Sequence, residues 1–424
     1  MNILFLSFVG LLILGVEVGF AMIVAAWLGL EFKPGPAVDA IMLPTSMLSG
    51  ISLYALVQIP LFILAGEVMN RGGITRRLVS VSSAWIGPRR GSLGHVSILS
   101  NLMLSGISGS AVADAVATGK ALIPEMRAKG YGAGYAGAVI ASGALLGPVI
   151  PPSIPMVVYA QIANVSVAKM FLSGVIPGLL LAGGFLVICS IIGHRRDLPR
   201  EPSMTWKEKF GVTGRAAWAL LMPVIILVGI RMGLMTDTEI AAIAVIYSLL
   251  VGFFIYRSMN IAELPGILMA AGRSSAVILF LLAAAAPFSW LVAESQISEH
   301  LVEMIRQVTD NPHLILLIVN LLLLAIGLVL EPLPAMVIFL PALLPLAAEL
   351  GIDPIHFGAV VVVNLMIGLL HPPIGLLLFV VCSVDRIPFL PVAREVLPFL
   401  AWSIVVLVLL IFFPPLTTWL GQGL

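Results

Sequence analysis

Long apolar runs alternate with short polar segments along nearly the whole chain. Runs of the length that crosses a bilayer, roughly 17 to 25 residues, occupy 3–30, 43–69, 168–193, 216–232, 239–256, 266–293 and 396–420. Four further apolar runs, 91–125, 131–162, 313–350 and 355–383, are interrupted by glycine, serine and proline. The pattern predicts an all-α polytopic membrane protein with a polar loop at 194–215 and an amphipathic stretch at 294–312.

The interrupted runs occur as two related copies. Adding 221 to the residue number, without a gap, aligns 106–152 with 327–373 and gives 12 identities in 47 positions. The matches include the glycines and prolines at the interruptions, such as Gly147 with Gly368 and Pro151-Pro152 with Pro372-Pro373. We interpret this as an internal repeat, with a first unit at 1–210 and a second at 211–424.

Each unit is predicted to hold one re-entrant helical hairpin and one broken transmembrane helix. The hairpins are 91–125 and 313–350, and the broken helices are 131–162 and 355–383. Non-helical backbone at membrane depth occurs only where protein buries it or where it lines a cavity. The freed carbonyls and helix ends can then bind an ion or a substrate.

The distribution of Lys and Arg predicts the topology. With both hairpins returning to their own side, 17 of these residues lie on the cytoplasmic side and 4 on the outer side, as the positive-inside rule requires. We read 3–30 as a single retained span rather than a signal peptide. The N-terminus is then cytoplasmic and the C-terminus periplasmic, and the two repeats have opposite orientation, which is typical of secondary transporters.

Composition narrows the class further. The chain is 60% hydrophobic and 10% charged, against about 25% charged for a soluble domain. Its formal net charge of +1 gives no reason to expect a nucleic-acid partner. Cys189 and Cys382 both lie in apolar runs, so we expect buried thiols rather than a disulfide or a metal site.

The first interruption, 105–114, offers oxygen ligands. Its hydroxyls belong to Ser105, Ser108 and Ser110, and the carbonyls of Gly106 and Gly109 lie between them. Oxygen-only ligand sets suit a small hard cation. The alternative is that serine and glycine only allow helices to pack closely. Asp114 either holds the hairpin tip together or contacts the ion or substrate, and Lys120 either meets an anionic substrate or extends to the cytoplasmic face.

The second copy carries ionisable groups at the matching places. Glu331 lies deep in an apolar hairpin, which favours a functional role, although a helix cap before Pro332 is an equal alternative. His371 either responds to protons or substrate or bonds a freed carbonyl. Asn320 and Asn364 are expected to make interhelical hydrogen bonds, with Asn364 also a candidate for the site.

Several of these stretches resemble one family. Residues 65–74, 105–114, 147–153, 327–335, 350–358 and 364–375 are similar to the large membrane subunit of tripartite ATP-independent periplasmic (TRAP) transporters. The resemblance implies sodium-driven import of a small organic acid, such as sialic acid or a C4-dicarboxylate. It also implies two partners, a smaller membrane subunit of about four helices and a periplasmic substrate-binding protein, and a location in the bacterial inner membrane.

The resemblance also assigns sites, with Na⁺ as the coupling ion. Two sodium sites are implied where each hairpin tip meets the broken helix of its own half: Ser105, Gly106, Ser108, Ser110, Gly147 and Pro148, and then Gly327, Glu331, Gly368 and His371. The family usually has threonine at His371, which is a departure. Our candidates for substrate contact are Ser108, Ser110, Asp114, Pro151, Ser153, Asn364 and His371.

The mechanism expected is an elevator-type movement of 91–162 and 313–383 against the remaining helices, in a protein that is not an enzyme. A carrier that works without a binding protein is the first alternative. An intramembrane serine protease is a remote one, with Ser108 as nucleophile and His371 as base. A passive channel is disfavoured because hairpins close the midplane from both sides.

Overall fold

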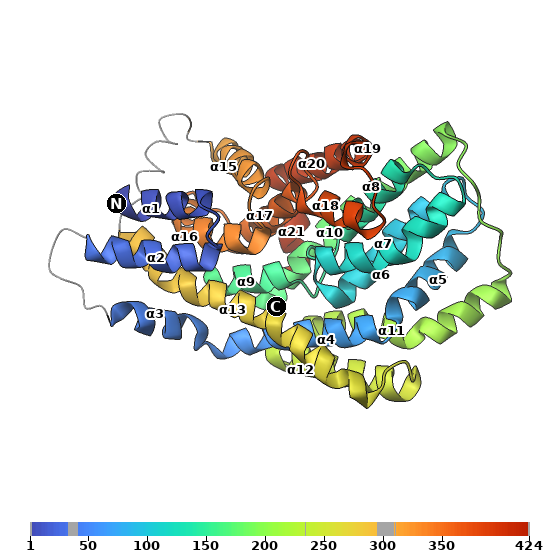
Figure 1. Ribbon diagram of the computed structural model, residues 1–424, viewed down its shortest axis with the longest axis horizontal. Helices are drawn as coiled ribbons and strands as arrows, with labels where there is room; N and C mark the ends of the chain where they lie inside the picture. Colours follow the sequence, from blue (N-terminus) through green and yellow to red (C-terminus); the bar gives the residue numbers. More distant parts are fainter. Residues whose placement is uncertain (1, 33–40, 234, 295–308, 310, 423–424) are drawn as a thin grey trace.

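The computed structural model describes residues 2–32, 41–233, 235–294, 309 and 311–422, and this part of the chain is almost wholly helical (Figure 1). The helices of the first half are α1 (Asn2–Ile13), α2 (Val18–Glu31), α3 (Met42–Ile51), the 3-10 helix η1 (Tyr54–Val57), α4 (Gln58–Arg71), α5 (Ile74–Ile86), α6 (Ser92–Ser108), α7 (Ala111–Ala128), α8 (Ala133–Ala144), α9 (Ile154–Ile162) and α10 (Val167–Arg195). Those of the second half are α11 (Trp206–Met232), α12 (Asp237–Leu250) with a π-helical extension (Val251–Ile255), the short η3 (Ile261–Glu263), α13 (Leu264–Glu294), α15 (Pro312–Gly327), α16 (Pro332–Glu349), α17 (Pro354–Gly368), α18 (Leu376–Val384), α19 (Phe389–Glu395), α20 (Leu397–Phe412), α21 (Pro415–Thr418) and η4 (Trp419–Gly421).

Several helices are long and apolar enough to cross a membrane unaided. Among the described residues five qualify by length and composition, and the bent pair α19–α20 makes a sixth. The 29 residues of α10 extend about 44 Å at 1.5 Å per residue. Most of the predicted spans are confirmed, and α11 begins earlier than predicted because Thr205 and Glu208 form a capping box within the loop that was expected at 194–215.

The prediction of one span over 3–30 is wrong. The chain folds there as two short helices, α1 and α2, which lie side by side with the N-terminus and the end of α2 at the same end of the molecule (Figure 1). Gly15 ends α1 with a left-handed φ of 80°, and Val16 N–H donates to the Leu11 carbonyl at 3.0 Å, as in a Schellman cap. The apolar pattern alone does not reveal this reversal.

Two other segments also differ from the prediction. The expected span 43–69 is divided into α3, η1 and α4, and Pro60, which has no N–H to donate, lies in the first turn of α4. Residues 74–86, which lie between the predicted span 43–69 and the predicted hairpin 91–125, form the helix α5 and pack against α6 and α11. The amphipathic stretch expected at 294–312 lies mostly outside the described residues.

The paired hairpins and broken helices are confirmed. The first hairpin is α6–α7 and the second is α15–α16, and they occupy opposite ends of the long axis with their tips toward the centre (Figure 1). The broken helices are α8–α9 and α17–α18. The bounds of α7 and α16 differ by 221 at both ends, which is the offset of the sequence repeat.

The two halves interlock through these elements. Each hairpin packs against the first part of its own broken helix, with α6 and α7 on α8 and α15 and α16 on α17. The second arm of each hairpin also contacts the second part of the other broken helix, as α7 does with α18 and α16 with α9. Around them α4 packs on α12 and α13, and α13 also on α2 and α3. In this arrangement the two hairpin tips and the breaks of the two broken helices all lie in one central region.

Candidate functional site

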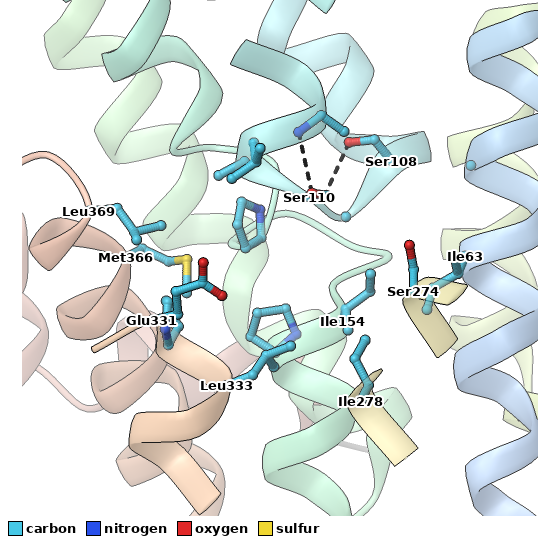
Figure 2. A pocket seen from close by; sticks show the side chains of 18 of the residues that line it. Ile63, Ser108, Ser110, Ile154, Ser274, Ile278, Glu331, Leu333, Met366 and Leu369 are labelled. Atoms are coloured by element: carbon cyan, nitrogen blue, oxygen red, sulfur yellow. Dashed lines mark hydrogen bonds between the residues drawn. The ribbon is translucent and has the colours of Figure 1, made fainter. Parts of the chain in front are cut away.

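A cavity of about 220 Å³ lies between the two hairpin tips. This is somewhat below the 300–1,000 Å³ typical of pockets for drug-sized ligands, so it suits a small molecule. Figure 2 shows the tip of α6–α7 on one side, Glu331 at the start of α16 on another, and side chains of α4 and α13 facing them. The cavity is therefore built from both repeats and from the surrounding helices.

The first hairpin tip presents hydroxyl groups. Gly109 ends α6 with a left-handed φ of 60°, and a Cβ there would lie 2.7 Å from the Pro152 carbonyl oxygen, so only glycine fits without movement. Ser110 N–H donates to Ser108 Oγ at 3.3 Å. Ser110 Oγ in turn accepts from Ala113 N–H at 3.4 Å as the N-cap of α7, an ordinary role for serine.

The second hairpin tip presents a carboxylate. Glu331 precedes α16 but makes no side-chain cap hydrogen bond. Its side chain is exposed and lines the cavity, facing the region of Ser110 in Figure 2. Of the two roles considered from sequence, the geometry therefore favours contact with a cavity ligand over capping.

Four helices begin at this cavity. Lining residues come from the first turns of α7 (Ala111–Ala113), α9 (Ile154 and Pro155), α16 (Pro332 and Leu333) and α18 (Leu376). Helix N-termini carry partial positive charge and unpaired N–H groups, and they stabilise anions. With the hydroxyls of Ser108, Ser110 and Ser274, the cavity combines anion-stabilising dipoles with hydrogen-bonding side chains.

Asp114 lies behind the first tip and does not line the cavity. It is fully buried, and neither carboxylate oxygen has a hydrogen-bond partner of ordinary geometry among the described residues. A Cβ added to Gly147 would lie 2.6 Å from Asp114 Oδ2, so the carboxylate touches the backbone where α8 ends. A buried charged carboxylate without a partner is costly, so this group is either protonated or neutralised by a cation at the junction between hairpin and broken helix.

In the second half, too, the hairpin and the broken helix meet through their backbones. A Cβ on Gly368, the last residue of α17, would lie 2.6 Å from the Gly327 carbonyl oxygen at the end of α15. Both positions were predicted to belong to one site, and the structure brings them into contact. Gly327 and Gly368 are helix-end residues, where carbonyls lose their intrahelical partners, and the Gly368 carbonyl accepts a hydrogen bond from His371 N–H at 3.2 Å.

Other predicted residues serve the fold in this structure. Ser153 caps α9, accepting from Met156 N–H at 3.2 Å and donating to the Pro148 carbonyl. Asn364 donates to Asn320 Oδ1 at 2.6 Å and to its carbonyl at 2.8 Å, which confirms the predicted interhelical hydrogen bonds. Neither Ser153 nor Asn364 lines the cavity, so their proposed substrate contact finds no support in this geometry.

His371, Pro151, Ser105 and Gly106 are also absent from the cavity lining. His371 Nδ1 lies 2.6 Å from the Pro372 carbonyl oxygen, which matches the alternative of a histidine bonding a freed carbonyl. Ser105 donates within α6 to Leu102 at 2.6 Å. Gly106 packs against Pro223, whose side chain a Cβ would meet at 2.6 Å. Pro148 does line the cavity.

Sequence reasoning missed three polar residues of the cavity. Glu67 and Asn70 come from α4 and Ser274 from α13. Glu67 and Asn70 lie in the stretch 65–74 that carries the family resemblance, which was the signal available for them. Ser274 belongs to the polar group Arg273-Ser274-Ser275 inside an apolar run, and that interruption was the signal available.

The remote protease alternative has no geometric support. Ser108 accepts a hydrogen bond from Ser110, and His371 faces the Pro372 carbonyl. No hydrogen bond joins Ser108 to His371 in the described part of the chain. A nucleophile needs a base within hydrogen-bond reach, so this pair is not an acyl-transfer site.

Two opposed re-entrant hairpins, two broken helices and a polar cavity between them define a membrane carrier. A family model described as the tripartite ATP-independent periplasmic transporter, DctM component, matches residues 5–416. The chain belongs to this family, which comprises the large permease subunits of TRAP transporters, and it is a multi-pass membrane protein.

Individual relatives support the same assignment. The chain is 38% identical over 416 residues to the sialic acid TRAP transporter large permease protein of Vibrio cholerae, covering 98% of this chain and 97% of that protein. It is 35% identical over 378 residues to the 2,3-diketo-L-gulonate TRAP transporter large permease protein of Escherichia coli, with 89% of each covered. A C4-dicarboxylate TRAP transporter large permease protein of Pseudomonas aeruginosa is 38% identical over 374 residues, covering 87% of this chain and 88% of that protein.

The fold is also found in a solved structure. The YdaH transporter of Alcanivorax borkumensis, whose crystal structure is described as having an unusual topology, aligns with a TM-score of 0.67 at 16% identity. The alignment covers 96% of this chain and 97% of the other. At this identity the likeness concerns the fold alone.

Proposed function

We propose that this chain is the large membrane subunit of a Na⁺-coupled importer for a small organic acid, located in the bacterial inner membrane. The observation that carries the proposal is the convergence of four helix N-termini and three serine hydroxyls on one cavity between the hairpin tips. Such a site favours a carboxylate. The relatives named for sialic acid, diketogulonate and C4-dicarboxylates are consistent with this ligand class.

Sodium would bind at the two junctions of hairpin and broken helix. The first junction would use Asp114, whose buried carboxylate lies near the Ser108 hydroxyl but has no hydrogen-bond partner of ordinary geometry among the described residues. Backbone and hydroxyl oxygens of 105–110 and 147–148 would complete it. The second would use the helix-end carbonyl of Gly327, against which the backbone of Gly368 lies. Glu331 faces the cavity. Because an ionised carboxylate only accepts hydrogen bonds and repels a substrate carboxylate, we assign Glu331 to hydrogen-bond donors of the substrate rather than to this ion.

Binding at both junctions would couple the ion to the substrate, because each ion fixes a hairpin tip that also lines the cavity. An electrical potential of about 100 mV contributes ~2.3 kcal/mol for each net positive charge moved inward. At 1.4 kcal/mol per factor of ten, one net charge supports roughly 50-fold accumulation. In this account α6–α9 and α15–α18 move together against the remaining helices.

The orientation follows from the charges and the corrected N-terminal hairpin. Residues 1–32 contain no Lys or Arg, so the reversal of α1 and α2 leaves the charge distribution of the later loops unchanged. The α6–α7 hairpin would enter from the cytoplasm and α15–α16 from the periplasm. We place both termini on the periplasmic side, which revises the cytoplasmic N-terminus expected from sequence.

Two partners complete the proposed transporter. A small membrane subunit of about four helices would pack beside this chain in the lipid, and a periplasmic binding protein would deliver the acid. The alternative of a stand-alone carrier keeps the same ion and substrate sites but needs neither partner.

A panel of labelled acids tests the proposed substrate class and coupling ion. Cells that lack their own carriers for these acids would express this chain with its partner proteins and receive sialic acid, a diketogulonate or a C4-dicarboxylate. We expect uptake of one of them in Na⁺ medium, and uptake at the level of the empty vector when choline replaces Na⁺. Equal uptake in choline would contradict sodium coupling.

A further inference from the structure

A second cavity, of about 850 Å³, lies beside the first at the end of the molecule that we assign to the cytoplasm. It is bounded by the end of α4, by α5 and by the outer part of α7. Four of its lining residues are cations, Arg71, Arg76, Arg77 and Lys120, and none of the described residues that line it is acidic. We call this cavity the basic vestibule.

The vestibule continues the central cavity along two helices. On α7, Ala113 lines the central cavity and Ala117, Lys120 and Ala121 line the vestibule. This spacing places them on one helix face, over about 12 Å at 1.5 Å per residue. On α4, Asn70 lines both cavities, so the two spaces share a wall.

The cations of the vestibule are not neutralised by neighbouring carboxylates. In the described part of the chain no ion pair involves Arg71, Arg76, Arg77 or Lys120. Arg77 is held by other contacts, donating to the Gly72 carbonyl at 3.2 Å and lying 3.8 Å from the centre of the Tyr256 ring. Arg71, Arg76 and Lys120 are exposed to the vestibule space.

Some basic residues elsewhere at the same end are paired with carboxylates. Arg127 pairs with Asp385 at 2.6 Å, Lys129 with Glu125 and Glu201 at 2.7 Å each, and Arg196 with Glu395 at 2.9 Å. One acidic residue, Glu67, lies on α4 one turn before Arg71, but it lines the central cavity instead. Other cations at this end, such as Arg89 and Arg215, also have no ion pair among the described residues, so the distinguishing feature of the vestibule is that four cations line one cavity.

We infer that the basic vestibule is a low-affinity binding site for small organic carboxylates on the cytoplasmic exit route of the transported acid. A cavity lined by charges of one sign concentrates counter-ions, and exposed guanidinium and ammonium groups hydrogen-bond carboxylate oxygens. The vestibule would hold an anion that leaves the helix N-termini of the central cavity. The identity of the ligand as the transported acid rests on the proposed function, but the test below needs no transport.

The test compares thiol reagents of opposite charge at one position. Cys189 and Cys382 are replaced by alanine, and Ala117→Cys places a thiol in the vestibule wall of the full-length chain in phosphatidylcholine nanodiscs. The measured quantity is the ratio of modification rates by an anionic sulfonatoethyl and a cationic trimethylammonioethyl methanethiosulfonate. Because both reagents attack the same thiol, its own ionisation cancels in the ratio. Ser203→Cys, in the exposed loop before α11, is the reference position.

We expect the ratio at Ala117→Cys to exceed the reference by about tenfold at low ionic strength and to approach it at high salt. The double substitution Arg76→Gln with Lys120→Gln should lower the ratio several-fold. Lys207→Gln with Arg215→Gln removes the same charge from exposed positions on α11 and should leave it unchanged. Succinate, the probe carboxylate, should slow modification in the parent chain and not in the Arg76/Lys120 variant.

Two results would overturn the inference. One is a ratio at Ala117→Cys equal to the reference, which would mean that the cavity exerts no selective attraction on anions. The other is protection by phosphatidylglycerol nanodiscs while succinate has no effect in either lipid, which would make the vestibule a lipid headgroup site. Charge selectivity with succinate protection but without Na⁺-driven uptake would support the vestibule and count against the proposed transport function alone.

Discussion

Replacing Asp114 by asparagine is expected to abolish sodium-driven uptake, lowering it at least ~100-fold. The physical reason is that the carboxylate is fully buried, lies against Gly147 and lacks a partner among the described residues. Asparagine keeps the size of the side chain but not the charge that would bind the ion. The uptake rate is measured in proteoliposomes with the partner chains, and Asp237→Asn, at the start of α12, is the matched control.

The same substitution makes a second, opposite prediction for stability. Without sodium, the unpartnered carboxylate destabilises the folded chain because it is removed from water. Asp114→Asn should therefore unfold a few degrees higher than the parent in choline. Sodium should raise the unfolding midpoint of the parent through preferential binding to the folded state and should not change that of the variant.

This pair of measurements separates the two roles considered for Asp114. If the carboxylate only held the hairpin tip together, the variant would be less stable in both sodium and choline. A sodium response that is undiminished in Asp114→Asn would contradict the proposed ion site.

The second large effect is expected from Gly368→Ala. The added Cβ would approach the Gly327 carbonyl oxygen to 2.6 Å and the Gly327 Cα to 2.8 Å. These are backbone atoms at the ends of α15 and α17, so the two helices must separate to accommodate it. Overpacking typically costs about 1–3 kcal/mol, which corresponds to roughly 5- to 150-fold in an equilibrium constant.

We expect Gly368→Ala to need a higher sodium concentration for half-maximal uptake and to lower the maximal rate at least ~10-fold. Gly272→Ala is the control, because a Cβ at Gly272 meets nothing within 4 Å on α13. Membrane insertion is followed by the amount of folded protein recovered. If the sodium dependence of uptake were unchanged in Gly368→Ala, the proposed second ion site would be contradicted.

The repeat made much of the architecture predictable. Glycine and proline at matching positions 221 residues apart located both hairpins and both broken helices, and the bounds of α7 and α16 follow that offset. Charge counting placed the two hairpins on opposite sides. The fold of 3–30 was not predictable in this way. A hydrophobic run shows how many residues can lie in the membrane, but it does not show whether the chain crosses once or turns back. Gly15 and Glu17, the residue before α2, mark the reversal.

The site was less predictable than the fold. Ser108, Ser110 and Glu331 were identified because polar side chains interrupt apolar runs at the repeat. Ser153 and Asn364 are also polar residues within interrupted apolar runs, yet they form hydrogen bonds to Met156 and Asn320 within the protein. Sequence does not distinguish a polar group that faces a cavity from one that stabilises a helix break. Both occur where a helix is interrupted and backbone N–H and C=O groups lose their helical partners.

Reconstituted uptake with and without the binding protein tests the central claim most directly. Proteoliposomes containing this chain and its small membrane subunit would receive the labelled acid under an inward Na⁺ gradient or under equal Na⁺ on both sides. We expect the acid to accumulate only when the binding protein and the Na⁺ gradient are both present. Accumulation that requires the gradient but not the binding protein would contradict the tripartite assignment and make the chain a stand-alone carrier.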